Sequence, residues 1–82
     1  MEVKRETPTT NGRSLDVEID DETIRVEISK HPDWDRRIDI ERDSDSWGFA
    51  IDEETAEPIA VDTHPEWVET LLWELGIQEV GK

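Results

Sequence analysis

Apolar and polar residues alternate along the middle of the chain, which is the pattern of β-strands with one buried face. Two such runs flank residues 21–22, and their apolar members are Leu15, Val17, Ile19, Ile24, Val26 and Ile28. A two-residue turn at 21–22 would place Leu15 opposite Ile28 and bring all of these side chains to one face. On the other face Asp16 would then lie opposite Glu27, a like-charge pair. The pattern therefore predicts a β-hairpin.

A second pair of alternating runs follows, and its apolar members are Ile38, Ile40, Trp47, Phe49 and Ile51. The polar residues 43–46 predict a four-residue loop between the runs, which would place Ile38 opposite Ile51. A fifth short strand is predicted at Ile59–Val61, after a loop that contains Pro58.

The C-terminal part of the chain changes to helical periodicity. Its apolar residues fall on one helical face, and they are Trp67, Val68, Leu71, Leu72 and Leu75. Thr63 and Glu66 have the spacing of a capping box at the helix start. Gly76 stands where a C′ glycine ends a helix, and in a Schellman motif the following Ile77 would contact Leu72.

Together these elements predict one α+β domain over residues 14–82. Its sheet is an antiparallel β-meander of four to five strands, and the C-terminal α-helix packs on the apolar face of that sheet. Residues 1–13 are polar and contain Pro8 and the turn dipeptide at 11–12. We expect them to form a flexible N-terminal segment, with a loose edge hairpin as the alternative.

A partial internal repeat suggests a different fold. Residues 15–38 align with 47–71 with one insertion, and the alignment matches His-Pro-Asp-Trp at 31–34 with His-Pro-Glu-Trp at 64–67. A true duplication would give a ββα-ββα arrangement with a helix near 33–42, where the local alternation predicts a strand. Acid-rich composition alone also produces such similarity, and the alternation favours the strand.

The chain is strongly acidic. Its 23 Asp and Glu residues and nine Lys and Arg residues give a net charge of −14, which is spread along the sequence. Cysteine is absent, so disulfides and cysteine-ligated metals are excluded. Lysine is scarce. This composition resembles that of small acidic cytosolic proteins from haloarchaea. Low hydrophobicity with high charge is also typical of disorder, but the apolar periodicity favours a folded chain.

The charge and hydropathy also restrict location and partners. No apolar run approaches the ~18 residues that a membrane span needs, and the first residues lack the apolar core of a signal peptide. We therefore expect a cytoplasmic protein. The negative charge disfavours direct binding to nucleic acid or to anionic membranes, while hydrated cations would gather non-specifically at the acidic surface.

Candidate chemistry is sparse. His31 and His64 have carboxylates nearby in the sequence, namely Asp33, Asp35, Asp62 and Glu66. A small metal-binding protein or enzyme that uses these histidines is the alternative function, although the spacing matches no established ligand pattern. The chain has no glycine-rich phosphate loop and no nucleophile elbow. We assign no catalytic, cofactor-binding or metal-ligating residue.

The tryptophans are more informative, since the chain has four of them and no tyrosine. Trp47 and Trp67 fit the predicted core by periodicity. Trp73 falls on the polar side of the helix with Glu66 and Glu69, where an exposed indole is a candidate contact for a partner. Covering the N-terminal segment or a sheet edge is its alternative role.

Trp34, in the turn that follows the first hairpin, is a weaker candidate contact of the same kind. We expect a non-enzymatic protein-interaction or regulatory module that binds a protein partner or forms a homodimer. The homodimer would form through Trp73 or a sheet edge.

Overall fold

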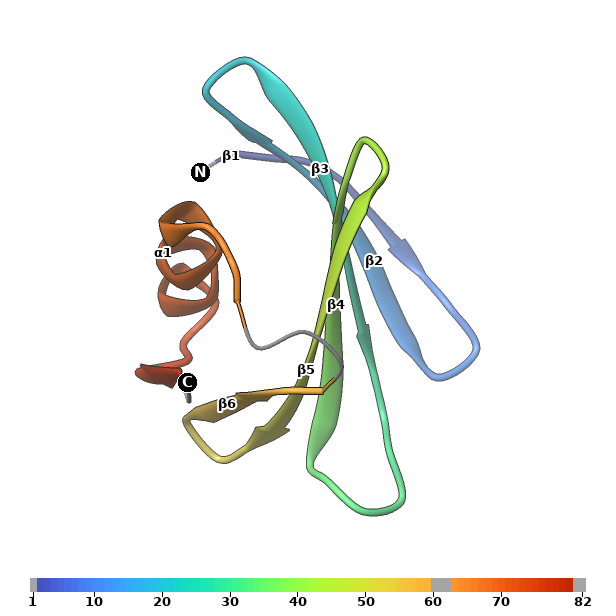
Figure 1. Ribbon diagram of the computed structural model, residues 1–82. Helices are drawn as coiled ribbons and strands as arrows, with labels where there is room; N and C mark the ends of the chain where they lie inside the picture. Colours follow the sequence, from blue (N-terminus) through green and yellow to red (C-terminus); the bar gives the residue numbers. More distant parts are fainter. Residues whose placement is uncertain (1, 60–62, 81–82) are drawn as a thin grey trace.

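The computed structural model describes residues 2–59 and 63–80. Within these residues the chain forms a single seven-stranded sheet whose strands lie in sequence order, and one helix that precedes the last strand (Figure 1). The elements are β1 (Glu2–Pro8), β2 (Gly12–Ile19), β3 (Glu22–Ser29), β4 (Arg36–Arg42), β5 (Asp45–Asp52), β6 (Thr55–Pro58), α1 (Glu66–Glu74) and β7 (Glu79–Val80). Neighbouring strands from β1 to β6 are antiparallel, and β7 runs parallel to β6.

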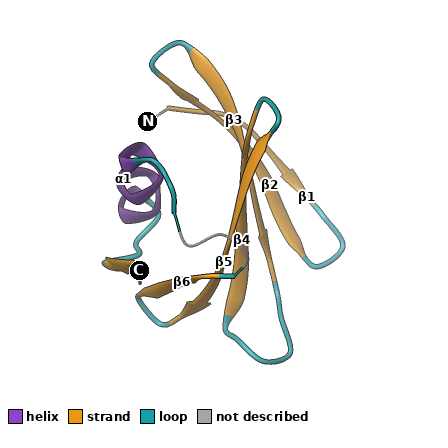
Figure 2. Ribbon diagram, viewed as in Figure 1, coloured by secondary structure: helices purple, strands orange, loops and turns teal. Residues whose placement is uncertain are grey.

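The predicted meander of four to five strands with a packed helix is wrong, because the sheet has additional strands at both edges and is mixed (Figure 2). All residues of β1 are exposed, so its sequence carries no burial pattern, and it is held by pairing with β2. At the other edge the backbone N–H groups of Gln78 and Glu79 both donate to the carbonyl of Glu54. Backbone hydrogen bonds hold both strands, and only β7 adds an apolar contact, because Val80 is partly buried against the core.

The N-terminal segment forms the edge hairpin that was the alternative prediction, because β1 pairs antiparallel with β2. The predicted flexibility of this segment stays a prediction, because strand pairing does not measure motion. The ββα-ββα alternative is wrong, since residues 36–42 form β4. Of the predicted strand Ile59–Val61, residues 60 and 61 lie outside the described residues, and β6 ends just before it at Pro58.

Both predicted hairpins form, but each register differs from the prediction by two residues. In β2–β3 Leu15 pairs with Val26 instead of Ile28, and in β4–β5 Ile38 pairs with Phe49 instead of Ile51. A slip of two residues keeps every side chain on its face, so the apolar pattern fits either register.

The turns decide the register. In β2–β3 the turn is Asp20-Asp21, whose φ angles of 50° and 66° lie in the left-handed region that a two-residue turn of this hand needs. The like-charge pair predicted between Asp16 and Glu27 is therefore wrong. Asp16 lies opposite Arg25, and an oxygen of the Asp16 carboxylate is 3.8 Å from Arg25 Nε.

The core lies between the sheet and α1. Its buried members come from β2 to β6, from α1 and from the segment after it; they are Leu15, Val17, Ile24, Val26, Ile38, Ile40, Phe49, Ile51, Ala56, Val68, Leu71, Leu72 and Ile77. Trp47, Trp67 and Leu75 are partly buried and pack against this cluster. The opposite face of the sheet carries the charged residues.

The two ends of α1 differ. The predicted capping box is wrong, because Pro65 is the N-cap residue and no side chain caps the helix. The Schellman motif is confirmed. Gly76 has a φ of 96°, and its N–H donates to the Trp73 carbonyl, while the N–H of Ile77 donates to that of Leu72, both at 3.0 Å. The motif turns the chain so that the side chain of Ile77 is buried in the core.

Candidate functional site

The outer face of α1 carries the most exposed large apolar side chain of the described residues. Trp73 is 67% exposed, on the side of the helix opposite the buried Val68, Leu71 and Leu72. Glu66, which is exposed, and Glu69, which is half-buried, lie on the same side of the helix as Trp73. The helix therefore presents an indole flanked by carboxylates, as the helical periodicity predicts.

Unlike Trp73, Trp34 is half-buried, and its ring is in contact with another side chain. Its ring stacks on His31, with ring centroids 4.0 Å apart and an angle of 20° between the planes. The Nδ1 atom of His31 accepts a hydrogen bond from the backbone N–H of Asp33 at 3.2 Å. These contacts give both rings a role in shaping the β3–β4 connection.

His64 lies at the interface between α1 and the sheet. Its side chain is 6% exposed, and its ring meets Phe49 edge-to-face at 5.5 Å. Its Nε2 atom is 3.6 Å from Glu69 Oε1, so Glu69 faces His64 as well as solvent. The Nδ1 atom of His64 is buried without a hydrogen-bond partner among the residues described.

In the part of the chain that the structure describes, these histidines do not form a metal site with neighbouring carboxylates. In residues 2–59 and 63–80, no group of three or more His, Asp or Glu side chains is arranged to hold an ion. Asp62, one of the four neighbouring carboxylates, lies outside the described residues. His31 and His64 are instead engaged in separate aromatic contacts, with Trp34 and Phe49.

An aromatic cluster closes the core beside α1. Trp47 and Trp67 meet edge-to-face with centroids 5.4 Å apart, and the guanidinium carbon of Arg42 lies 4.9 Å from the Trp67 ring centroid. Arg42 also donates to a carboxylate oxygen of Glu22 at 3.1 Å. Both indoles therefore serve packing, as their periodicity predicts.

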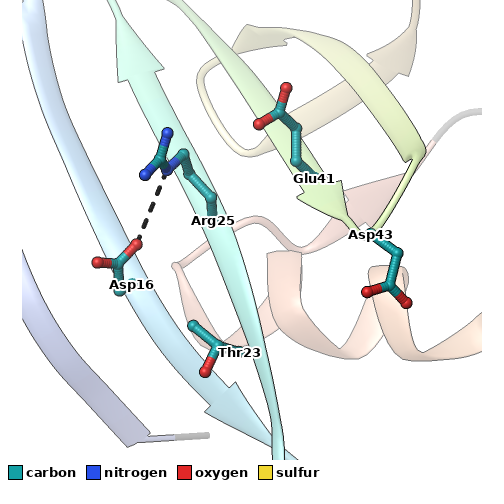
Figure 3. A pocket seen from close by; sticks show the side chains of 5 residues that line it. All are labelled: Asp16, Thr23, Arg25, Glu41 and Asp43. Carbon is teal, nitrogen blue, oxygen red and sulfur yellow. Dashed lines mark ion pairs between the residues drawn. The ribbon is translucent and has the colours of Figure 1, made fainter.

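A shallow hollow of about 250 Å³ lies on the charged face of the sheet, and Figure 3 shows its lining side chains: Asp16, Thr23, Arg25, Glu41 and Asp43. The carboxylates of Glu41 and Asp43 point in opposite directions in this view, while Asp16 pairs with Arg25. These side chains do not form a group that could coordinate an ion within the described residues.

A second hollow, of about 360 Å³, was not predicted. It lies where the β1–β2 turn meets the β3–β4 connection, and its lining includes Arg13, Lys30 and Arg36. Arg13, Lys30 and Arg36 are far apart in the sequence, and no local pattern predicts that they line one hollow. The sequence shows only that basic residues are rare, which makes three of them at one place unexpected.

A scan of protein-family models and searches of curated proteins and of solved structures find no significant match to this chain. In the described part of the chain no helix has the length and apolar character needed to cross a membrane.

Proposed function

We propose that this chain is a non-enzymatic interaction module that binds a basic protein partner through the outer face of α1, with Trp73 at the centre of the contact. The observation that carries the proposal is the 67% exposure of Trp73 on a helix whose opposite face is buried in the core. We place this activity in the cytoplasm.

Two physical properties of this face support a basic partner. An indole offers a large apolar surface together with a π-face that attracts Lys and Arg cations. Glu66 and Glu69 lie on the same side of the helix, where they can pair with Lys or Arg of the partner at contact range, a distance over which salt screens little. In a homodimer through this face the carboxylates of one copy would meet those of the other, which disfavours the homodimer.

The test uses an arginine-rich peptide as the probe, with binding followed by calorimetry. Trp73→Ala is expected to weaken binding about tenfold or more, which is the loss of at least ~1.4 kcal/mol expected for a central aromatic contact. Val3→Ala is the matched control, because Val3 is another exposed apolar residue, at 49% exposure. Thermal unfolding of both variants checks that the fold is intact.

Equal affinities of the Trp73→Ala and Val3→Ala variants would sink the proposal. Sedimentation of the wild-type chain and of Trp73→Ala provides a second decision. If the wild type is a dimer and the variant a monomer, Trp73 contacts a second copy of the chain, and the basic partner is rejected.

We further propose that the acidic surface adapts the protein to high salt, as its haloarchaeal-type composition implies. Like charges lie opposite each other at Glu27 and Asp39, on the neighbouring strands β3 and β4. The other such pair, Glu2 with Glu18, is bridged by Lys4, whose Nζ atom lies 3.4 Å and 3.8 Å from the two carboxylates. Such pairs destabilise a sheet unless salt screens them.

A further inference from the structure

The unpredicted hollow combines two loops that are joined by their backbones. The N–H of Lys30 donates to the carbonyl of Asn11 at 3.0 Å, which ties the β3–β4 connection to the β1–β2 turn. Gly12 is needed here, because a Cβ atom at this position would collide with the carbonyl oxygen of Ile28. The lining residues are Asn11, Gly12, Arg13, Ile28, Ser29, Lys30, Asp35 and Arg36.

The charge of this hollow is opposite to that of the protein. Three of the nine basic residues of the chain line it, together with a single acidic residue, Asp35. The Asp35 carboxylate already accepts a hydrogen bond from the backbone N–H of Glu53 at 2.7 Å. The charged residues around this mostly apolar hollow are therefore mainly basic, on a protein in which acidic residues are more than twice as numerous.

Two of the three cations have no ion-pair partner among the described residues. Arg13 pairs with Glu6, with Nη1 and Oε1 3.0 Å apart. Within the described residues Lys30, Arg36 and Arg5 form no ion pair, whereas Lys4, Arg25, Arg37 and Arg42 all do. Two of these three unpaired cations line the same hollow, where an anion from outside the chain could neutralise both.

The Arg36 side chain supplies an independent indication. Its Nε atom is buried and has no hydrogen-bond partner within the described residues. A buried charged donor without an acceptor is costly, and an anionic oxygen would remove that cost. Arginine is also the side chain that best matches the geometry of phosphate oxygens.

We propose that this hollow binds a small molecule that carries a phosphate group. Arg36 and Lys30 hold the phosphate, and Arg13, which is paired with Glu6, lies beside them. Asn11 and Ser29 offer neutral donors, and Ile28 provides an apolar wall for the rest of the ligand. A volume of about 360 Å³ falls within the range of small-molecule sites, which begins at ~300 Å³. This site is separate from the Trp73 face.

The experiment titrates the ¹⁵N-labelled full chain with phenyl phosphate at constant ionic strength and follows the backbone amide and arginine Nε–H resonances. Saturable shifts are expected at Ser29, Lys30 and Arg36, with the Arg36 Nε–H signal among the largest. Inorganic phosphate is expected to shift the same resonances at a higher concentration, because it lacks the part that would pack on Ile28.

The variants Arg36→Gln and Lys30→Gln are each expected to raise the Kd for phenyl phosphate about tenfold. Arg25→Gln is the matched control, since Arg25 lies on the charged face and pairs with Asp16, and its Kd should equal that of the wild type. Lys30 is exposed, so its variant keeps the test valid if Arg36→Gln fails to fold.

Shifts that never saturate, or that are unchanged in Lys30→Gln, would overturn the proposal. Equal weakening by Arg25→Gln would do the same, because it would mean that phosphate responds only to total charge. Trp73→Ala should leave phosphate binding unchanged, which separates this test from that of the proposed partner face.

Discussion

Asp20 and Asp21 occupy the β2–β3 turn in the left-handed region, with φ angles of 50° and 66°. Glycine adopts this conformation without steric cost, and aspartate tolerates it better than most other residues do. The turn also places two carboxylates next to each other in a chain that is already strongly acidic. The backbone conformation and the charge can be separated by substitution at Asp21.

Asp21→Gly is expected to be more stable than Asp21→Ala by about 1 kcal/mol, although glycine is normally the less favourable replacement in a structured segment. Both variants remove the same negative charge, so the difference reports the left-handed backbone alone. Urea unfolding of the two variants measures it. If the alanine variant is equally stable or more so, the turn does not have this conformation.

Candidate residues differ in how far the sequence could reveal them. The exposure of Trp73 follows from helical geometry, because a residue two positions from Leu71 and Leu75 lies on the opposite side of the helix. Its role in binding stays a prediction. Arg13, Lys30 and Arg36 meet only because two loops are joined through Asn11 and Lys30, and no local pattern carries that information.

At the level of elements, the sequence determines which face of a strand is buried but not how the strands are aligned. The alternation of Leu15 and Val17 with acidic residues is satisfied equally by partners at 24 and 26 or at 26 and 28. The conformations of the turn residues select between these registers. Strand β1 could not be predicted from apolar periodicity, because all of its residues are exposed and it is held by backbone pairing with β2.

The stability of α1 depends on the turn at its C-terminal end and on its buried face. Only nine residues long, it has no side-chain N-cap and no basic residue in its last turn. A helix of this length is not stable by itself in water. Burial of Val68, Leu71 and Leu72 therefore holds it, and the turn through Gly76 adds Ile77 to the same core.

Gly76→Ala tests this ending directly. A Cβ atom at Gly76 would meet nothing within 4 Å, so the cost comes from the backbone φ of 96° and not from a clash. We expect a loss of about 1 kcal/mol and a fall in Tm of ~4–8 °C, measured by circular dichroism. Gly76→Asn should fall between the wild type and the alanine variant, because asparagine tolerates the left-handed region. Equal Tm values for all three would contradict the assignment.

For the whole molecule, the exposed edge of β1 bears on self-association. An unpaired strand edge is a template for pairing with another chain, and natural proteins blunt such edges with charges, bulges and proline. β1 has all three: charged residues along its length, an irregularity between Val3 and Arg5, and Pro8 at its end. A homodimer through this edge is therefore disfavoured by the strand itself.

The charged face of the sheet is only partly neutralised. Arg37 Nε donates to both carboxylate oxygens of Asp39 at 3.1 Å, but the opposing Glu27 has no cation of its own in the described residues. The Debye length falls from about 10 Å at ~0.1 M salt to about 3 Å at ~1 M. Repulsion between neighbouring carboxylates should therefore weaken strongly over this range.

The midpoint of thermal unfolding is expected to rise substantially between ~0.1 M and ~1 M sodium chloride, because salt screens repulsion in the compact state more than in the unfolded chain. Chloride is the appropriate salt, since sulfate also stabilises proteins by exclusion from their surface. Glu27→Gln provides the internal control. It should raise the midpoint at low salt by removing one member of the like-charge pair, and this gain should shrink toward zero at ~1 M. A midpoint that does not change with salt would reject the proposed adaptation, and a Glu27→Gln gain that persists at high salt would show that screening is not its cause.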